Sequence, residues 1–365
     1  MYQPHTARLG LTQDVFLESG LCCCNLASDL RIIYMITPPL TKAPTIMEQP
    51  ENSGTVSPQI MDWLLNGDVS IAWQTNKDLL DIDRPALRAR IATEGWGHTL
   101  LKVQRPDLHW GEGFYAVKWI STHYTLLDLK HLGLPGDHPA ATGSVDMLLD
   151  TVKERDGGVN PTSSIHKSDV CINGMFLNYA CYFGADACKL HSIVDFTLSQ
   201  QLPDGGFNCR YNRQGARHSS VHSTLSVLEG IESYRKNGYT YRLDDMLKSA
   251  ECGTEFLLMH RLYKSDRTGL IISPRFLKFP YPCRWFYDIM RALDHFATSS
   301  TPYDPRMRDA LEIIISKRNK EGRWKLNAPY SGKVHLTMEE AGKPSRWNTL
   351  RALRILRKYA AEAEV

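Results

Sequence analysis

The sequence predicts an all-α fold in which about five to six helical hairpins stack into a closed ring. A turn rich in glycine and acidic residues recurs along the chain, with one helical pattern before each turn and a second after it. The sequence has no convincing run of alternating β-branched residues, so we expect no substantial sheet. A hairpin of two helices cannot bury its apolar face alone, so neighbouring hairpins must stack. Long loops that end in aromatic or polar residues favour a closed ring with a functional site at its centre over an open solenoid.

The glycine turns define the repeat. They begin at residues 110, 156 and 204, which are 46 and 48 residues apart, and the later steps are longer. The turns are Trp110–Phe114, Asp156–Val159, Asp204–Phe207, Asp266–Gly269 and Lys320–Trp324.

A helix is expected on each side of every turn, because apolar residues such as Leu247, Ala250, Phe256 and Leu257 recur at helical spacing. The helices before the turns are predicted at 87–103, 145–153, 191–201, 245–262 and 307–318. The helices after the turns, which we expect to form the inner ring, are predicted at 119–132, 169–183, 218–234, 284–296 and 345–359. A partial pair is expected at 58–80.

The first 46 residues differ from the rest of the chain. They contain the run Cys22-Cys23-Cys24 and keep no amphipathic period, and a second methionine, Met47, precedes an ordinary polar segment. We therefore interpret residues 1–46 as a disordered or mis-assigned extension. Residues 47–365 are predicted to form a single domain.

Composition excludes several classes of protein. Of 365 residues, 42% are hydrophobic and 23% are charged, which is typical of soluble globular proteins and not of disordered or collagenous chains. The net charge of +3 is too small for general nucleic-acid binding, and no apolar run approaches the roughly 20 residues of a membrane span. Nine cysteines without a CxxC pair indicate reduced thiols and a cytoplasmic protein. The sequence indicates no nucleotide cofactor and identifies no protein partner.

Two segments carry a family resemblance. The Asp204–Phe207 turn, preceded by Gln200-Gln201, resembles the repeat of squalene cyclases and of protein prenyltransferase β subunits. So does the segment Trp119–Leu127, which follows a Trp-Gly-x-Gly turn. The repeat pattern covers residues 57–360. The resemblance implies an (α/α) toroid with inner helices around a central cavity, and a transferase, lyase or isomerase acting on an apolar, isoprenoid-like small molecule.

The starts of the inner helices supply the candidate site residues, because helix N-termini often place functional groups. The residues expected to bind substrate there are Trp119, His123, Trp285 and Trp347. The run Arg284–Asp288 combines aromatic walls, which stabilise cations, with ionisable groups. Its candidate catalytic residues are Arg284, Tyr287 and Asp288.

A zinc site is a further expectation. His218 and His222 are four residues apart, so within one helix they share a face, and Asp169 and Cys171 begin the preceding inner helix. Protein prenyltransferase β subunits resemble this, since an Asp-x-Cys at one inner helix and a histidine at the next bind their zinc. In this sequence Asp169, Cys171 and His222 match that pattern.

A second alignment leaves the zinc ligands open. It starts from the segment Gly205–Arg213 and puts Ala216 and His218 where the Asp and Cys of the family pattern stand. The resemblance also implies that Arg210 and Arg213 hold a diphosphate, because guanidinium forks suit phosphate. The alternative is that these arginines form surface salt bridges.

Three functions remain open from the sequence. The first is a zinc-dependent enzyme with an aromatic-lined central cavity, acting on an apolar substrate whose anionic end lies near Arg210 or Arg213. The second is a metal-free terpenoid cyclase or isomerase that works by proton transfer. The third is a non-catalytic toroid that only binds. The sequence lacks the Asp-x-Asp-Asp and Asp-Asp-x-x-Asp motifs, which disfavours a standard squalene-type cyclisation.

Overall fold

The computed structural model describes residues 56–162 and 164–363. The extension predicted at residues 1–46 lies outside the described residues. Helices dominate the described chain, and its only sheet there is the two-residue antiparallel pair of β1 (Trp324–Lys325) and β2 (Pro344–Ser345). The all-α prediction is therefore confirmed.

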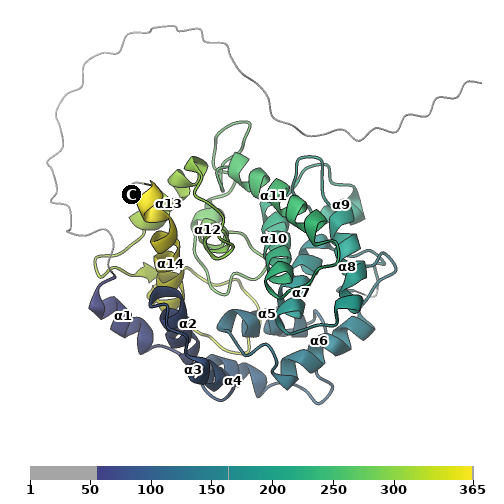
Figure 1. The fold of residues 1–365 in the computed structure, drawn as a ribbon, viewed down its shortest axis with the longest axis horizontal. Coiled ribbons are helices and arrows are strands. Elements are labelled where there is room, and N and C mark those ends of the chain that lie inside the picture. Colours follow the sequence, from purple (N-terminus) through teal and green to yellow (C-terminus); the bar gives the residue numbers. More distant parts are fainter. Residues whose placement is uncertain (1–55, 163, 364–365) are drawn as a thin grey trace, which may run out of the picture. The chain divides into compact units, whose positions relative to one another are not determined.

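The predicted helical pairs appear in the predicted order (Figure 1). The partial first pair is α1 (Pro58–Leu65) with α2 (Val69–Leu79), followed by α3 (Pro85–Ala89) and α4 (Gly95–Leu101) before α5 (Thr122–Leu132). Next come α6 (Pro139–Thr151) with α7 (Val170–Tyr182), and α8 (Ala187–Ser199) and the short α9 (Arg210–Gln214) with α10 (Val221–Lys236). The last pairs are α11 (Leu243–Met259) with α12 (Ile289–Thr298), and α13 (Arg308–Ser316) with α14 (Arg346–Ala363).

Three inner helices begin three or more residues later than predicted, and one of them is α5, which starts at Thr122 instead of 119. Helix α12 starts at Ile289 instead of 284, because the Asp288 carboxylate accepts a hydrogen bond from the Arg291 backbone and caps the helix there. Helix α10 starts at Val221 instead of 218. Residues 218–220 and 284–288, which were predicted to begin α10 and α12, therefore lie before these helices, and this changes where their side chains point.

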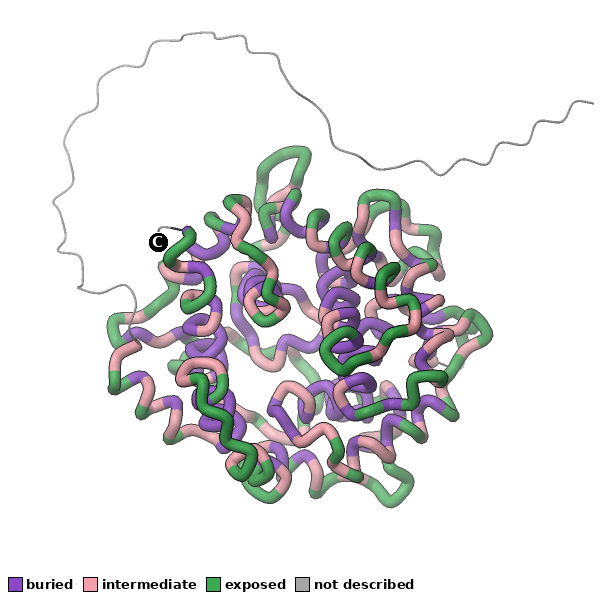
Figure 2. The backbone as a smooth tube through the Cα atoms, viewed as in Figure 1, coloured by how far each residue is buried: buried purple, intermediate pink, exposed green. Residues whose placement is uncertain are grey.

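The second helix of each pair is buried along most of its length, as the purple segments of Figure 2 show. We call α2, α5, α7, α10, α12 and α14 the inner helices. Helix α5 packs on α7, α7 on α10, α12 on α14, and α14 on α2, while α4 contacts both α2 and α5. Between α10 and α12, Arg291 forms an ion pair with Glu229 at 2.6 Å. The contacts among these helices thus lead from α2 back to α2.

The recurring glycine turn is held by the start of the following inner helix. In one turn the Asp156 carboxylate accepts hydrogen bonds from the backbone and hydroxyl of Ser168, both at 2.7 Å, and the next turn repeats this with Asp204 and Ser219. The second glycine of the turn lies against this serine: a Cβ on Gly158 would be 2.7 Å from the Ser168 Cβ. The Asp-Gly-Gly pattern is therefore a clamp that fixes each inner helix to its preceding turn.

Among the described residues, no helix is both long and apolar enough to cross a membrane. The described helices belong to one compact unit.

Candidate functional site

The segment 279–287, which we call the partition segment, links three inner helices. At one end the Phe279 carbonyl accepts a hydrogen bond from Asn348 of α14 at 2.8 Å. In the middle Arg284 forms a buried ion pair with Asp128 of α5. At the other end the Tyr287 backbone N–H donates to the His222 Nδ1 of α10 at 2.8 Å. The segment separates a polar cavity, which Tyr281 and Cys283 line, from two cavities on the side where the inner helices begin.

The larger cavity on that side, about 680 Å³, has mainly aromatic walls, and we call it the aromatic cavity. The rings of Phe286 and Tyr330 stack with centroids 3.5 Å apart. The Trp285 ring also stacks on Phe286, with the two centroids 3.9 Å apart. The wall continues to Phe276 and His222, whose centroids are 5.4 Å apart. The other lining residues are Ser219, Ser220, Val221, Phe256, His260, Ser265, Ile272, Ser273, Arg275 and Tyr287.

Two N–H groups are available in this aromatic wall. Because the His222 Nδ1 accepts from the Tyr287 backbone, the proton of the neutral ring is on Nε2. Burial, together with the smaller effect of the Arg291 charge, lowers the pKa of His222 to about 4, so the ring is neutral near pH 7. The Trp285 Nε1 is buried and has no hydrogen-bond partner among the described residues. The cavity can therefore offer hydrogen bonds to an oxygen atom of an otherwise apolar ligand.

A smaller cavity of about 170 Å³ lies beside it, lined by Trp119, Tyr281, Arg284 and Tyr330 among others. The Arg284 guanidinium lies over the rings of Trp119 and Tyr124, 5.7 and 5.8 Å from their centroids. The Trp119 Nε1 donates to the Ser331 carbonyl at 2.6 Å. This space is too small and too strongly cross-linked to be the main ligand cavity.

The three predicted catalytic residues mainly hold the partition segment. The Tyr287 hydroxyl donates to the Leu262 carbonyl at 2.5 Å, and burial raises its pKa well above the usual range. Asp288 caps α12, and burial raises the pKa of its carboxyl group, whose Oδ2 has no partner among the described residues. Arg284 is occupied by Asp128. Of the three, only Tyr287 lines the aromatic cavity.

The predicted substrate-binding aromatic residues do not share one cavity. Trp285 lines the aromatic cavity, Trp119 lines the smaller one, and Trp347 lines the polar cavity, where it stacks on Tyr281. His123 is fully buried, contacts the Tyr179 hydroxyl at 3.2 Å, and has a pKa that burial lowers to about 3.

The residues expected to bind zinc do not fit a metal site. The prediction that His218 and His222 share a helix face is wrong, because α10 begins after His218, which is exposed. Asp169 forms an ion pair with Arg213 at 2.9 Å. The neighbouring Cys209 thiol and burial raise the pKa of Cys171, which favours a neutral thiol over a thiolate ligand. Within 56–162 and 164–363, no group of three or more His, Cys, Asp or Glu side chains could hold a metal ion.

The two arginines expected to hold an anion do not line any of these cavities. Arg213 pairs with Asp169 and its Nε also donates to the Lys167 carbonyl at 3.2 Å, so the salt-bridge alternative describes it correctly. Arg210 is exposed at the start of α9.

Sequence reasoning missed Phe276, Tyr330, Ser265 and Ser273 of the aromatic cavity. They lie in the long loops after α11 and after β1, where no repeat pattern marks them. The only signal available was aromatic residues in loops next to Arg284–Asp288.

No protein-family model and no curated protein matches the chain. Among solved structures, the chain is similar to the apo type II terpene cyclase MstE from Scytonema. The two share 12% sequence identity, the TM-score is 0.32, and the match covers 76% of this chain and 98% of that chain.

Proposed function

We propose that the chain is a terpenoid cyclase-like enzyme that binds an apolar, isoprenoid-like substrate in the aromatic cavity. The carrying observation is the pair of N–H groups, His222 Nε2 and Trp285 Nε1, set in a wall of stacked aromatic rings. In this proposal the described helices form an (α/α) toroid. Its support is the series of helix contacts that leads from α2 back to α2.

The walls suit an apolar substrate that gains positive charge during reaction. Ligand cavities are mostly apolar, hold a few oriented polar groups, and measure about 300–1,000 Å³. The rings of Trp285, Phe286 and Tyr330 present π faces, which attract cations. A cavity of about 680 Å³ with this lining favours a chain-like or cyclic hydrocarbon over a peptide or nucleotide.

The proposed chemistry is a metal-free isomerisation or cyclisation, the second of the three functions considered from the sequence. In the proposed step a double bond of the substrate attacks the carbonyl carbon of an aldehyde group in the same molecule. The carbonyl oxygen gains negative charge and accepts hydrogen bonds from His222 Nε2–H and Trp285 Nε1–H, while the alkene carbon that gains positive charge faces the aromatic rings. The proton lost next to that carbon passes to the oxygen atom, so the product is an isomer of the substrate. The Tyr287 backbone N–H holds the His222 tautomer that makes this donation available. The role of Tyr287 is thus to position His222 and not to transfer a proton itself.

The test compares His222→Gln with His218→Gln in the full chain. We expect isoprenoid alcohols and aldehydes to quench tryptophan fluorescence of the wild type. Gas chromatography coupled to mass spectrometry should detect an isomeric product, which has the mass of the substrate and a different retention time. His222→Gln should lower kcat/KM at least tenfold, chiefly through kcat. His218→Gln is the matched control, because His218 is exposed and lies outside the cavity, and it should leave both readouts unchanged.

Other results of this test would favour a different function or refute the proposal. Binding without any product would favour the non-catalytic scaffold over the enzyme. Absence of isoprenoid binding, or equal activity of the two variants, would refute the proposal.

A further inference from the structure

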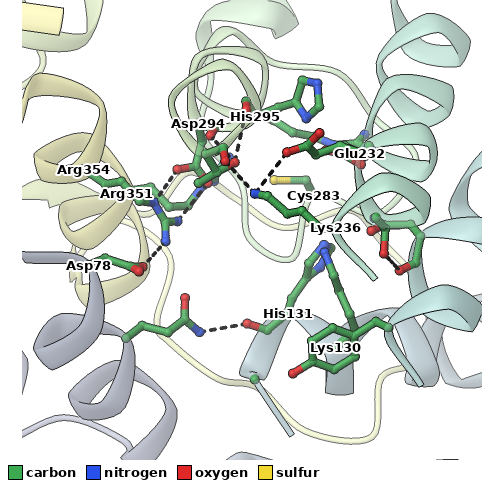
Figure 3. A pocket seen from close by; sticks show the side chains of 18 of the residues that line it. Asp78, Lys130, His131, Glu232, Lys236, Cys283, Asp294, His295, Arg351 and Arg354 are labelled. Atoms are coloured by element: carbon green, nitrogen blue, oxygen red, sulfur yellow. Dashed lines mark hydrogen bonds and ion pairs between the residues drawn. The ribbon is translucent and has the colours of Figure 1, made fainter. Parts of the chain in front are cut away.

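A second cavity, about 410 Å³, lies on the other side of the partition segment and is lined by residues of the inner helices. Figure 3 shows Lys130 and His131 of α5 facing Arg351 and Arg354 of α14, with Glu232 and Lys236 of α10 at the side. All six inner helices contribute to it, and we call it the polar cavity.

Every carboxylate that lines this cavity already has a cationic partner. Asp294 accepts from Arg354 at 2.7 Å and from Arg351 at 3.4 Å, and Asp78 accepts from the same Arg354. Glu229 is held by Arg291 through two contacts, at 2.6 and 2.8 Å. Glu232 pairs with Lys236 at 3.2 Å and with Arg235 at 2.9 Å. The acidic groups are therefore not free to bind a cationic ligand.

Several polar atoms of the cavity, most of them donors, lack partners among the described residues. The Nη1 of Arg351 and both amide atoms of Asn178 are buried without a hydrogen bond, although these side chains are only 4% and 1% exposed. The ammonium of Lys130 lines the cavity and forms no ion pair within the described chain. An unpaired guanidinium N–H and amide in the protein interior cost free energy that a bound ligand can recover.

We propose that the polar cavity binds a small molecule through an oxyanion group, a phosphate or a carboxylate, held by Lys130, Arg351 and Asn178. Guanidinium and ammonium groups prefer such oxygen atoms, and the Asn178 amide adds two N–H donors. The unpaired Nε1 groups of Trp73 and Trp347, which also line the cavity, offer two further donors. This site is separate from the aromatic cavity, because the two cavities share no lining residue: the partition segment contributes Tyr281 and Cys283 to the polar cavity and Trp285, Phe286 and Tyr287 to the aromatic cavity.

The neighbouring histidines fit the same ligand. Burial lowers the pKa of His131 to about 3 and that of His295 to about 4, so both rings are neutral near pH 7 and can accept or donate one hydrogen bond. The anion would then be met by fixed cations and neutral polar groups, with no unpaired carboxylate to repel it.

The test is a titration of the full chain with inorganic phosphate, inorganic diphosphate and acetate, each compared with sodium chloride at equal ionic strength. We expect at least one of the three anions to raise the melting temperature beyond the chloride effect, because a ligand of the folded state stabilises it by mass action. Phosphate or diphosphate alone would identify a phosphorylated ligand, and acetate alone a carboxylate.

Variants assign the effect to the cavity. Lys130→Met should weaken anion binding at least tenfold, and Asn178→Leu should weaken it in the same direction. Lys248→Met, an exposed lysine on α11, is the control and should bind as the wild type does. If Arg351→Met fails to fold, the Lys130 and Asn178 variants still decide the question.

Two results would overturn the proposal: no anion-specific stabilisation, or equal binding by Lys130→Met and the wild type. Neither result depends on isoprenoid binding, which is followed separately through tryptophan fluorescence. Failure of this site and failure of the proposed function are therefore distinguishable.

Discussion

Gly174 of α7 and Gly230 of α10 lie against each other, backbone to backbone. A Cβ on Gly230 would be 2.4 Å from the Gly174 carbonyl oxygen, and a Cβ on Gly174 would be 2.6 Å from the Ser226 carbonyl oxygen. These distances leave no room for a methyl group, because the obstacle is backbone and cannot rotate away. The close approach of two inner helices thus depends on two small residues that no turn or helix signal requires.

Substitution of Gly230 by alanine should therefore destabilise the fold. Overpacking of a tightly packed interface typically costs about 1–3 kcal/mol, and chemical denaturation should report a loss in this range. Gly143→Ala on α6 is the control, because its Cβ would meet only Leu108 at 3.5 Å. There the better helix propensity of alanine should leave stability equal or slightly raised. Equal stability of the two variants would contradict the contact.

The ion pair of Asp128 and Arg284 should be necessary for the partition segment. Both side chains are 7% exposed, so Asp128→Ala leaves a buried guanidinium without its partner, which typically costs about 3–5 kcal/mol. The double variant Asp128→Leu with Arg284→Met should recover part of this loss, since it removes both charges. Denaturant unfolding measures the free energy of unfolding of the wild type, the single variant and the double variant. A double variant less stable than the single variant would argue against a stabilising ion pair of Asp128 and Arg284.

The protein should bind no stoichiometric zinc at Asp169 and Cys171, because Asp169 is paired with Arg213, and His218 is exposed and precedes the start of α10. Elemental analysis of the purified chain tests this. The variant Cys22→Ser, Cys23→Ser, Cys24→Ser controls for metal bound by the cysteine run near the start. One zinc per chain that disappears in Cys171→Ala would contradict the prediction.

Stability should fall as the pH falls from about 6.5 to about 4. Burial lowers the pKa of His123 and His131 to about 3, and that of His222 and His295 to about 4. In the unfolded chain these histidines protonate near pH 6.5, so the unfolded state binds more protons in this range and gains free energy.

Melting temperatures at pH 7.5, 6 and 5 and constant ionic strength measure this loss. Glu229 does not contribute to it: the pKa of Glu229 is lowered to about 2, since Arg291 outweighs burial, so this carboxylate matters only below about pH 4.5. His123→Gln should make the pH dependence shallower. A melting temperature that stays constant from pH 7.5 to 5 would contradict the assignment.

The order and type of helices could be predicted because the repeat is local. The Asp-Gly-Gly turn needs a left-handed glycine, and Gly157 and Gly205 adopt φ of +90° and +88°. Helix starts were less predictable. Helix α12 begins five residues later than the apolar pattern suggested, because Asp288 caps its start through a hydrogen bond that spacing alone does not reveal.

The site was less predictable than the fold, because polar residues at helix starts have two uses. We expected such residues to face a cavity, but Ser219 clamps the Asp204 turn and Asn173 accepts a hydrogen bond from the Val159 backbone at 2.7 Å. His222 and Trp285 were identified, but for metal binding and general substrate contact. The polar cavity depends on residues about two helical turns further along the inner helices than the predicted site residues. Lys130 follows His123 by seven positions and Glu229 follows His222 by seven, and no motif marks either of them.

The partition segment has a consequence for how molecules reach the interior. The segment is tied to α14 through Phe279, to α5 through Arg284 and to α10 through Tyr287. For the segment to move aside as a whole, all three of these contacts have to break. While these anchors hold, a molecule cannot pass from the polar cavity to the aromatic cavity. Each cavity therefore exchanges its contents with solvent independently of the other.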